Sequence, residues 1–137
     1  MQLQQVAIAI EEKHMVSERV TPKPCPVVHF EIGCQNLKKT TDFYAKLFDW
    51  HIKPAAYTND IAAVKDGISG HIAAIGEKPD HYVTIYISVD KIEDYLERVV
   101  ALGGKAIVGP IVIPEGRFAW FMDPEGNQIG LLDQKQS

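Results

Sequence analysis

Two side chains that can transfer protons stand two positions apart near the first regular segment of the chain. His29 and Glu31 lie in the run from Val27 to Cys34, whose alternating β-branched and aromatic residues predict a strand. Side chains alternate across a strand, so both should project from the same face. An imidazole beside a carboxylate could do acid–base work, with burial raising the pKa of Glu31. The alternatives are a hydrogen-bonded histidine in a pocket or core and a carboxylate at a solvated rim.

The opposite face of these strands is apolar and should bury against helices. Phe30 and Ile32 alternate with His29 and Glu31 along the first strand. The later strands repeat this division. Their predicted buried positions are Val83, Ile85, Ile87, Ala119, Phe121, Ile129 and Leu131.

The face that carries His29 and Glu31 is aromatic and neutral-polar, whereas a solvated face would be mostly charged. Aromatic rings beside a few polar groups are typical of a ligand cleft. Packing against a dimer partner is the alternative. The other members of this face include Thr84, Tyr86, Ser88, Phe118, Trp120, Met122, Gln128 and Gly130.

The elements that position these residues follow the order βαβββ twice. In the first copy, Asn36 is placed to cap a helix over 37–48. In the second copy, Asp90 should cap the helix with Glu93 as its capping-box partner, and Gly103-Gly104 should end it. The predicted strands are 27–34, 50–54, 61–65 and 71–75, then 82–89, 105–108, 118–122 and 128–132.

The two copies can be aligned with each other. His29 then falls on Thr84, Ile32 on Ile87 and Leu47 on Leu102. The repeat predicts an α+β fold of paired βαβββ modules, residues 26–76 and 81–133, whose polar faces would line one concave surface if both sheets curl the same way. The helices should lie on the outside. Residues 26–133 would be a single domain, followed by a tail at 134–137.

Composition excludes several classes of protein. A chain of 137 residues, with 46% hydrophobic and 23% charged residues, has the balance of one globular domain. Fourteen Lys and Arg against 18 Asp and Glu give a net charge of −4, which argues against nucleic acid or an anionic membrane as the main partner. No run approaches the apolar length of a membrane span.

Residues 1–25 differ from the rest and are interpreted as an N-terminal extension with a proline-rich linker at Pro22, Pro24 and Pro26. The segment 6–10 could add an edge strand, pack on a partner chain or belong to a partly ordered tail. No secretory signal is recognisable. Cys25 and Cys34 are expected to be reduced thiols in a cytoplasmic protein, with a redox pair as the alternative.

The sequence resembles the vicinal oxygen chelate superfamily of glyoxalase I, extradiol dioxygenases and bleomycin-resistance-type binding proteins. The resemblance covers roughly residues 26 to 133 and rests above all on Asp123-Pro124-Glu125-Gly126-Asn127 before Ile129-Gly130-Leu131. The supporting segments are Pro26 to Ile32, Phe43 to Phe48, Ser88-Val89-Asp90 and Gly103-Gly104. It is similar to a branch labelled glyoxalase-like or lactoylglutathione-lyase-related. The resemblance implies that the paired βαβββ modules form a curled eight-stranded mixed sheet around a central cleft, with the helices on the outside, and that the protein is a homodimer.

Catalytic members of the superfamily hold a divalent metal in that cavity. The resemblance places the ligand positions at His29, Ala73, Thr84 and Gly130, of which only His29 is an effective ligand. About three protein ligands are needed for a catalytic site. We therefore expect no cofactor, with a rearranged divalent-metal site of His29, Glu31 and His71 as the alternative.

We expect the protein to bind a small oxygenated molecule in the cleft without the usual metal site. The ligand-binding candidates are His29, Glu31, His71, Thr84, Tyr86, Trp120 and Gln128. The alternative is a lyase- or isomerase-type enzyme in which His29 and Glu31 are catalytic. A structural dimerisation module is a third possibility.

Three further polar residues have simpler interpretations. His51 and His81 lie at strand ends and should be solvated. Arg117 could meet an anionic ligand or remain solvated.

Overall fold

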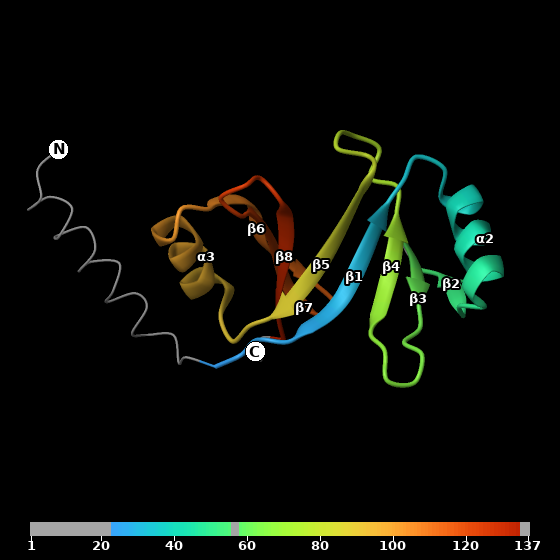
Figure 1. Cartoon of the computed structure of the whole chain (residues 1–137), viewed down its shortest axis with the longest axis horizontal. Coiled ribbons are helices and arrows are strands. Elements are labelled where there is room, and N and C mark those ends of the chain that lie inside the picture. Colours follow the sequence, from blue (N-terminus) through green and yellow to red (C-terminus); the bar gives the residue numbers. More distant parts are fainter. Residues whose placement is uncertain (1–22, 56–57, 135–137) are drawn as a thin grey trace, which may run out of the picture. The chain divides into compact units, whose positions relative to one another are not determined.

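The computed structural model describes residues 23–55 and 58–134, which fold into two compact units (Figure 1). The first unit is Val27–Tyr86, and the second is Ile87–Ser137 together with the segment that ends at Pro26. Most of the predicted N-terminal extension lies outside the described residues. The described part contains two helices and eight strands in the predicted order βαβββ-βαβββ, so the α+β class is confirmed. Its sheet is mixed and is not closed into a barrel.

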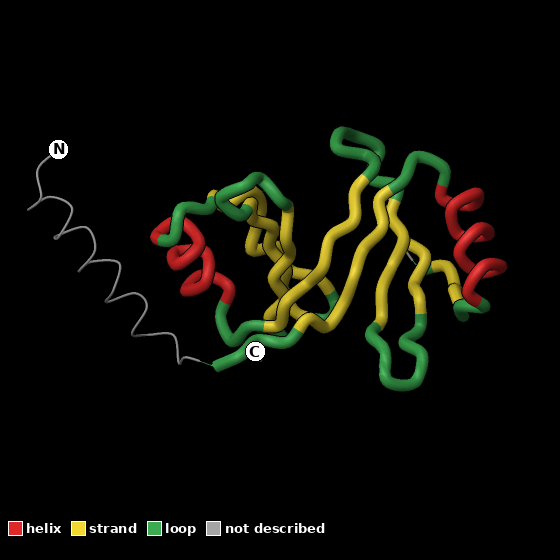
Figure 2. The backbone as a smooth tube through the Cα atoms, in the orientation of Figure 1, coloured by secondary structure: helices red, strands yellow, loops and turns green. Residues whose placement is uncertain are grey.

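The first unit carries its strands in the order β2-β3-β4-β1-β5. β1 pairs with β4 in parallel, while the neighbours β2, β3 and β4 pair antiparallel. The loops after β3 and after β4 emerge at opposite ends of these strands (Figure 2). The elements are β1 (Val27–Gly33), α2 (Leu37–Phe48), β2 (Ile52–Pro54), β3 (Thr58–Ile61), β4 (Ser69–Ala73) and β5 (Tyr82–Ser88), whose last two residues belong to the second unit.

Helix α2 begins and packs as the sequence predicts. The Asn36 side chain accepts a hydrogen bond from the Lys39 amide at 2.9 Å, which satisfies an otherwise unpaired donor of the first turn. Phe30 and Ile32 of β1 pack with Leu37 and Tyr44 of the helix against the buried residues Cys34, Ile61 and Ile72. This apolar packing forces His29 and Glu31 onto the other face of β1.

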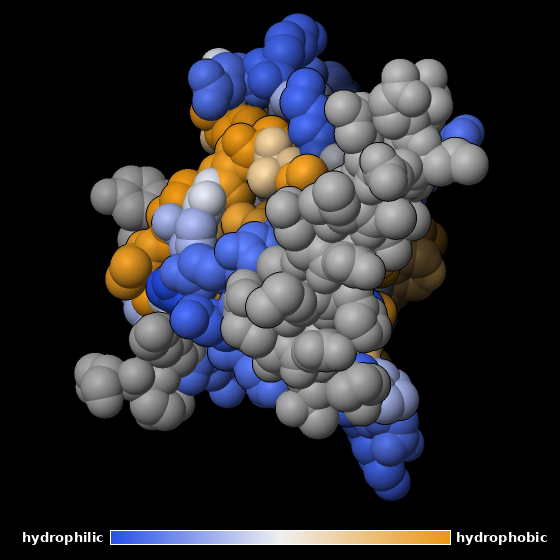
Figure 3. Space-filling view, turned by 90° about the vertical axis from the view of Figure 1, so that its left-hand side faces the viewer, coloured by the Kyte–Doolittle hydropathy of each residue, from blue (hydrophilic) through white to orange (hydrophobic). Residues whose placement is uncertain are grey.

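The second unit packs α3 (Ile92–Ala101) on three antiparallel strands in the order β8-β7-β6. They are β6 (Lys105–Ile113), β7 (Gly116–Met122) and β8 (Gln128–Asp133). Val89, Ile92, Ala119 and Leu131 form the buried core. Some apolar side chains are exposed, among them Val100, Leu102 and Val112. Figure 3, which shows the left-hand side of the view in Figure 1, has apolar patches beside hydrophilic ones.

The predicted glycine end of α3 is confirmed, and a tight turn follows β7. The amides of Gly103 and Gly104 donate to the carbonyls of Val100 and Val99, which is the Schellman pattern that ends a helix, and Gly103 has a φ of 96°. The turn between β7 and β8 closes through a 2.9 Å bond from the Gly126 amide to the Asp123 carbonyl.

The predicted cap of α3 is wrong. Its N-cap is Lys91, which makes no side-chain cap bond, and the Ile92 amide donates instead to Asp133 Oδ2 at 3.0 Å. Glu93 is not a capping-box partner, because its carboxylate binds Arg117 at 2.7 and 2.8 Å. A carboxylate from a distant strand therefore replaces the local cap.

The predicted burial of β5 is wrong at its beginning. Val83 is 70% and Ile85 37% exposed, whereas Thr84 and Tyr86 are nearly fully buried. The physical reason is helix placement, since α2 packs mainly on β4 and α3 mainly on β6, β7 and β8. β3 starts three residues before its predicted start, at 58 rather than 61. β6 continues with register shifts to Ile113, five residues beyond its predicted end at 108.

None of the described helices is long and apolar enough to cross a membrane.

Candidate functional site

A chain of hydrogen-bonded side chains runs across β1 and β4 of the first unit. We call it the relay, and it consists of Ser69, His29, His71 and Glu31. Nδ1 of His29 lies 2.8 Å from the Ser69 hydroxyl, and Nε2 of His29 lies 2.7 Å from Nδ1 of His71. Nε2 of His71 lies 3.2 Å from Glu31 Oε1. The parallel register explains the chain, because His29 is opposite Ser69 and Glu31 is opposite His71.

Glu31 is the buried end of the relay. It is 3% exposed and accepts hydrogen bonds from the hydroxyls of Tyr86, at 2.5 Å, and Tyr82. Burial raises the pKa of Glu31, but the hydrogen bonds from His71, Tyr82 and Tyr86 outweigh it and hold the pKa below its ordinary value. The expectation of a raised pKa is therefore wrong, and Glu31 is an ionised, buried carboxylate rather than one at a solvated rim.

His29 is held in its neutral form. Burial, followed by the neighbouring His71, lowers the pKa of His29 to about 4. The His29 and His71 rings are stacked with centroids 4.9 Å apart, and the Tyr86 ring lies edge-on to His29. Near neutral pH, one nitrogen of the His29 ring therefore donates a hydrogen bond and the other accepts one.

Tyr82 can take its position because Gly33 has no side chain. Its ring lies over Gly33, where a methyl group would overlap the ring carbons. Gly33 and Glu31 share one face of β1, so the ring crossing Gly33 brings its hydroxyl to the carboxylate. Burial, and then the bond to Glu31, raises the pKa of Tyr82. The tyrosine is therefore a permanent donor.

Sequence reasoning found part of the relay. His29, Glu31 and His71 meet, and Tyr86 joins them, as their predicted common face requires. Ser69 and Tyr82 were missed. The available signal was alternation, which places Ser69 with His71 and Tyr82 with Thr84 and Tyr86.

Three ligand-binding candidates are not members of the relay as defined above: Thr84, Trp120 and Gln128. Thr84 is 1% exposed, and Trp120 and Gln128 belong to β7 and β8 of the second unit. Their part in ligand binding stays a prediction, as does the cleft itself.

The residues present do not fit the metal site that the resemblance implies. Ala73, Thr84 and Gly130 supply no strong ligand, and the facing nitrogens of His29 and His71 bond to each other rather than to a common point. No group of three or more His, Cys, Asp or Glu side chains among residues 23–55 and 58–134 is arranged to hold an ion.

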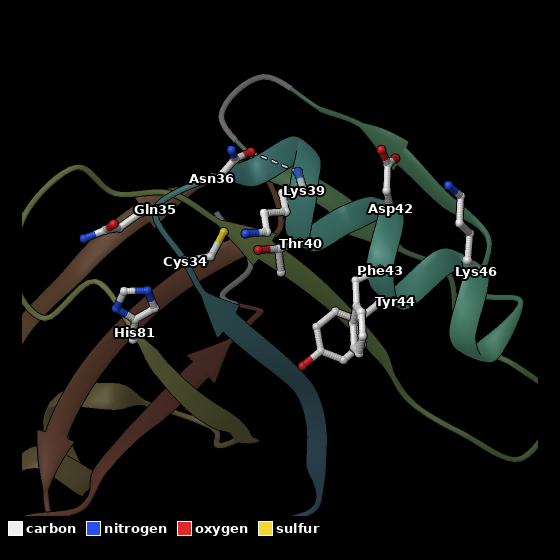
Figure 4. Close-up of a pocket in the computed structure, with 10 residues that line it drawn as sticks. All are labelled: Cys34, Gln35, Asn36, Lys39, Thr40, Asp42, Phe43, Tyr44, Lys46 and His81. Atoms are coloured by element: carbon white, nitrogen blue, oxygen red, sulfur yellow. Dashed lines mark hydrogen bonds between the residues drawn. The ribbon is translucent and has the colours of Figure 1, made fainter.

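A separate hollow of about 630 Å³ opens beside the beginning of α2 (Figure 4). Its lining includes Cys34 at the end of β1, Lys39 and Phe43 of α2, and His81 before β5. His81 and His51 are exposed, as predicted. Cys34 and Cys25 are free thiols. Cys34 packs in the core on the helix-facing side of β1, so this hollow is not part of the relay.

Arg117 is neither solvated nor available to a ligand. Its guanidinium binds Glu93 at 2.7 Å and Asp133 at 2.5 Å, and these residues together form what we call the ion cluster. Both simple interpretations of Arg117 are therefore wrong. The arginine instead ties α3 to β7 and β8.

Comparison with known structures supports the fold. The NAD-dependent benzaldehyde dehydrogenase from Legionella pneumophila matches with a TM-score of 0.60 and 15% identity over 78% of this chain and 98% of its own. A glyoxalase/bleomycin resistance protein/dioxygenase superfamily member from Vibrio splendidus 12B01 matches with 0.56 and 15%, over 80% and 98%. A methylmalonyl-CoA epimerase matches with 0.59 and 12%, over 85% and 100%. At such identities the likeness concerns the fold alone.

No curated protein matches the sequence. The model of one protein family does match, over residues 27–131, which cover nearly all of both βαβββ modules and the whole relay. The chain belongs to the Glyoxalase/Bleomycin resistance protein/Dioxygenase superfamily.

Proposed function

We propose that the protein binds a small, neutral, oxygen-bearing molecule on the face of β1 and β4 that carries the relay, without a metal ion held by His29, Glu31 and His71. The observation that carries this proposal is the charge of the relay. An ionised Glu31 sits next to a neutral His29. A second carboxylate, Asp60, lies opposite His71 on β3. This arrangement disfavours an anionic ligand, whereas hydroxyl and imidazole groups can hydrogen-bond to a neutral carbonyl or hydroxyl compound.

Two small probes of similar size test the charge preference. Dihydroxyacetone is neutral and lactate is anionic. In NMR titrations we expect dihydroxyacetone to shift the ring signals of His29 and His71, and lactate to shift them less. Tighter binding of lactate, or no response to dihydroxyacetone, would contradict the proposal. Thr40→Ala removes a half-buried hydroxyl of α2, away from the relay, and is the control variant.

Metal analysis tests the second half of the proposal. We expect the purified protein to carry no stoichiometric zinc, nickel, iron or manganese. A bound ion that is lost in His29→Ala would overturn the metal-free proposal. A homodimer, which the resemblance implies, is tested by light scattering over a range of concentrations.

A lyase- or isomerase-type enzyme is the second candidate, favoured by the continuous chain of ring nitrogens. Such a chain can accept a proton at one end and stabilise the resulting charge at the other. Turnover of the methylglyoxal–glutathione hemithioacetal that disappears in His29→Ala would favour this candidate over simple binding.

A further inference from the structure

We propose that Ser69 is a nucleophile, activated by Glu31 through His71 and His29, that accepts the acyl group of a small ester. This proposal rests on the proposed function in one respect, because the same face must admit a small oxygenated molecule. It goes further, because it assigns a covalent reaction to a named atom, the Ser69 hydroxyl oxygen.

The order of hydrogen bonds in the relay follows from its buried end. The ionised Glu31 only accepts, so Nε2 of His71 donates to it. When both rings are neutral, Nδ1 of His71 then has no hydrogen and accepts from Nε2 of His29. Nδ1 of His29 in turn accepts from the Ser69 hydroxyl. Each tautomer is determined by the preceding one, and the chain points the serine proton toward the carboxylate.

The geometry matches that of an activated hydroxyl. A serine nucleophile needs a base within hydrogen-bond reach and a further group that orients the base. The 2.8 Å contact between Ser69 and His29 supplies the base, and the 2.7 Å contact to His71 orients it. Two stacked imidazoles thus occupy the place that one histidine has in a Ser-His-Asp triad.

The burial of the relay also favours proton transfer from Ser69 toward Glu31. Glu31 is almost completely buried, whereas Ser69 is half-buried at the first residue of β4. The side chain of His71 is 19% exposed. The anionic end is therefore shielded by Tyr82 and Tyr86, and the hydroxyl end is the one that a substrate can reach.

The proposed step balances without a further reactant. The Ser69 oxygen attacks the ester carbonyl carbon as its proton passes to Nδ1 of His29. The Nε2 proton of His29 passes to His71, which becomes an imidazolium beside Glu31. When the tetrahedral intermediate collapses, the bond to the alkoxy group breaks and the protons return along the same path to the leaving alcohol. Water, activated in the same way, then hydrolyses the acyl-serine to a carboxylic acid and free Ser69.

The test uses p-nitrophenyl acetate with the full chain. We expect release of one equivalent of p-nitrophenolate in a rapid phase and an acetyl group on the peptide that contains Ser69. Ser69→Ala should abolish both, while Thr40→Ala, which removes a half-buried hydroxyl of α2, should leave both unchanged. His29→Gln removes the base and should slow acetylation about 100-fold or more. Glu31→Gln should slow it by a smaller factor.

The outcomes separate the two proposals. The assignment of Ser69 as a nucleophile would be overturned if the wild-type protein is not acetylated at Ser69. It would also be overturned if wild type and His29→Gln are acetylated at equal rates. Circular dichroism shows whether each variant is folded. Ser69→Cys tests the same site while keeping a nucleophile there, and the new thiol should react with iodoacetamide faster than Cys25. Binding of dihydroxyacetone that persists in Ser69→Ala would leave the binding function standing even if acetylation fails.

Discussion

Among the described residues, each unit buries one carboxylate, and different partners stabilise the two carboxylates. Glu31 in the first unit is 3% exposed, and Asp133 in the second is 1% exposed. Glu31 accepts bonds from two tyrosine hydroxyls and an imidazole. Asp133 accepts bonds from the Arg117 guanidinium and from the first amide of α3.

The difference between these partners separates a site that can do chemistry from one that maintains structure. Arginine stays protonated, so the ion cluster has no proton to move, and four hydrogen bonds hold Arg117 to Glu93 and Asp133. A neutral imidazole has one N–H donor and one acceptor nitrogen, so a chain of imidazoles can pass a proton along, and the relay ends at a hydroxyl. Burial of an acidic group is thus common to both clusters, and the identity of the donor distinguishes them.

Removing the Asp133 carboxylate should have the largest effect. Asp133→Ala leaves Arg117 and the Ile92 amide without their shared acceptor, and we expect the free energy of unfolding to fall by about 3–5 kcal/mol. Urea denaturation measures this change. The matched control is Asp90→Ala, whose exposed ion pair with Lys23 should contribute less than about 1 kcal/mol. Equal effects of the two substitutions would contradict a structural role for the ion cluster.

Replacing Glu31 should have an intermediate effect on stability. Glu31→Gln keeps the size of the side chain and removes its charge, so we expect a loss of about 1–3 kcal/mol. The pKa of Tyr82 should also fall, because the nearby negative charge helps to raise it. Ultraviolet difference titration of the tyrosines, with Tyr82→Phe to assign the signal, measures this second effect. An unchanged titration curve would show that Glu31 does not hold Tyr82.

The relay should make stability depend on pH where the ion cluster does not. The pKa of His29 is about 4 in the folded chain and 6.5 as the ordinary value, so the unfolded chain binds more protons between these values. The contribution of His29 to the free energy of unfolding is therefore fully present above about pH 6.5. It is lost as the pH falls toward 4, by at most about 1.4 kcal/mol per pH unit. NMR of the histidine ring nitrogens measures the titration. Protonation of His29 near pH 6.5 would contradict the buried neutral relay.

Replacing Glu93 should have the smallest effect on the free energy of unfolding, and this effect should depend on pH in a lower range than that of His29. Its hydrogen bonds to Arg117 lower its pKa to about 2. This contribution is present above the ordinary glutamate value and is lost as the pH falls toward 2. Because its side chain is 46% exposed, we expect about 1 kcal/mol or less. The difference in unfolding free energy between wild type and Glu93→Gln, measured from pH 5 downward, should shrink with acidification. A constant difference would contradict the ion pair.

The predictions from sequence succeeded where the signal was local. The strand period separated Phe30 and Ile32 from His29 and Glu31, and the two glycines after Leu102 ended α3. They failed at the start of α3, where Asp90 has the right residue type for a cap and Asp133 makes the bond. An N-cap motif records local preference only, and a buried carboxylate from another strand can take its place.

The sequence by itself determined the two βαβββ modules, the polar face of β1 and the family to which the chain belongs. Each of these depends on residue type and spacing over short segments. Only the tertiary structure decided which groups meet on that face. The parallel register of β1 with β4 joined His29 to Ser69 and Glu31 to His71, and the open space at Gly33 admitted Tyr82. Alternation along a strand is a property of the strand alone, but register is a property of a pair, and a shift by one residue would have left the same polar side chains without a relay.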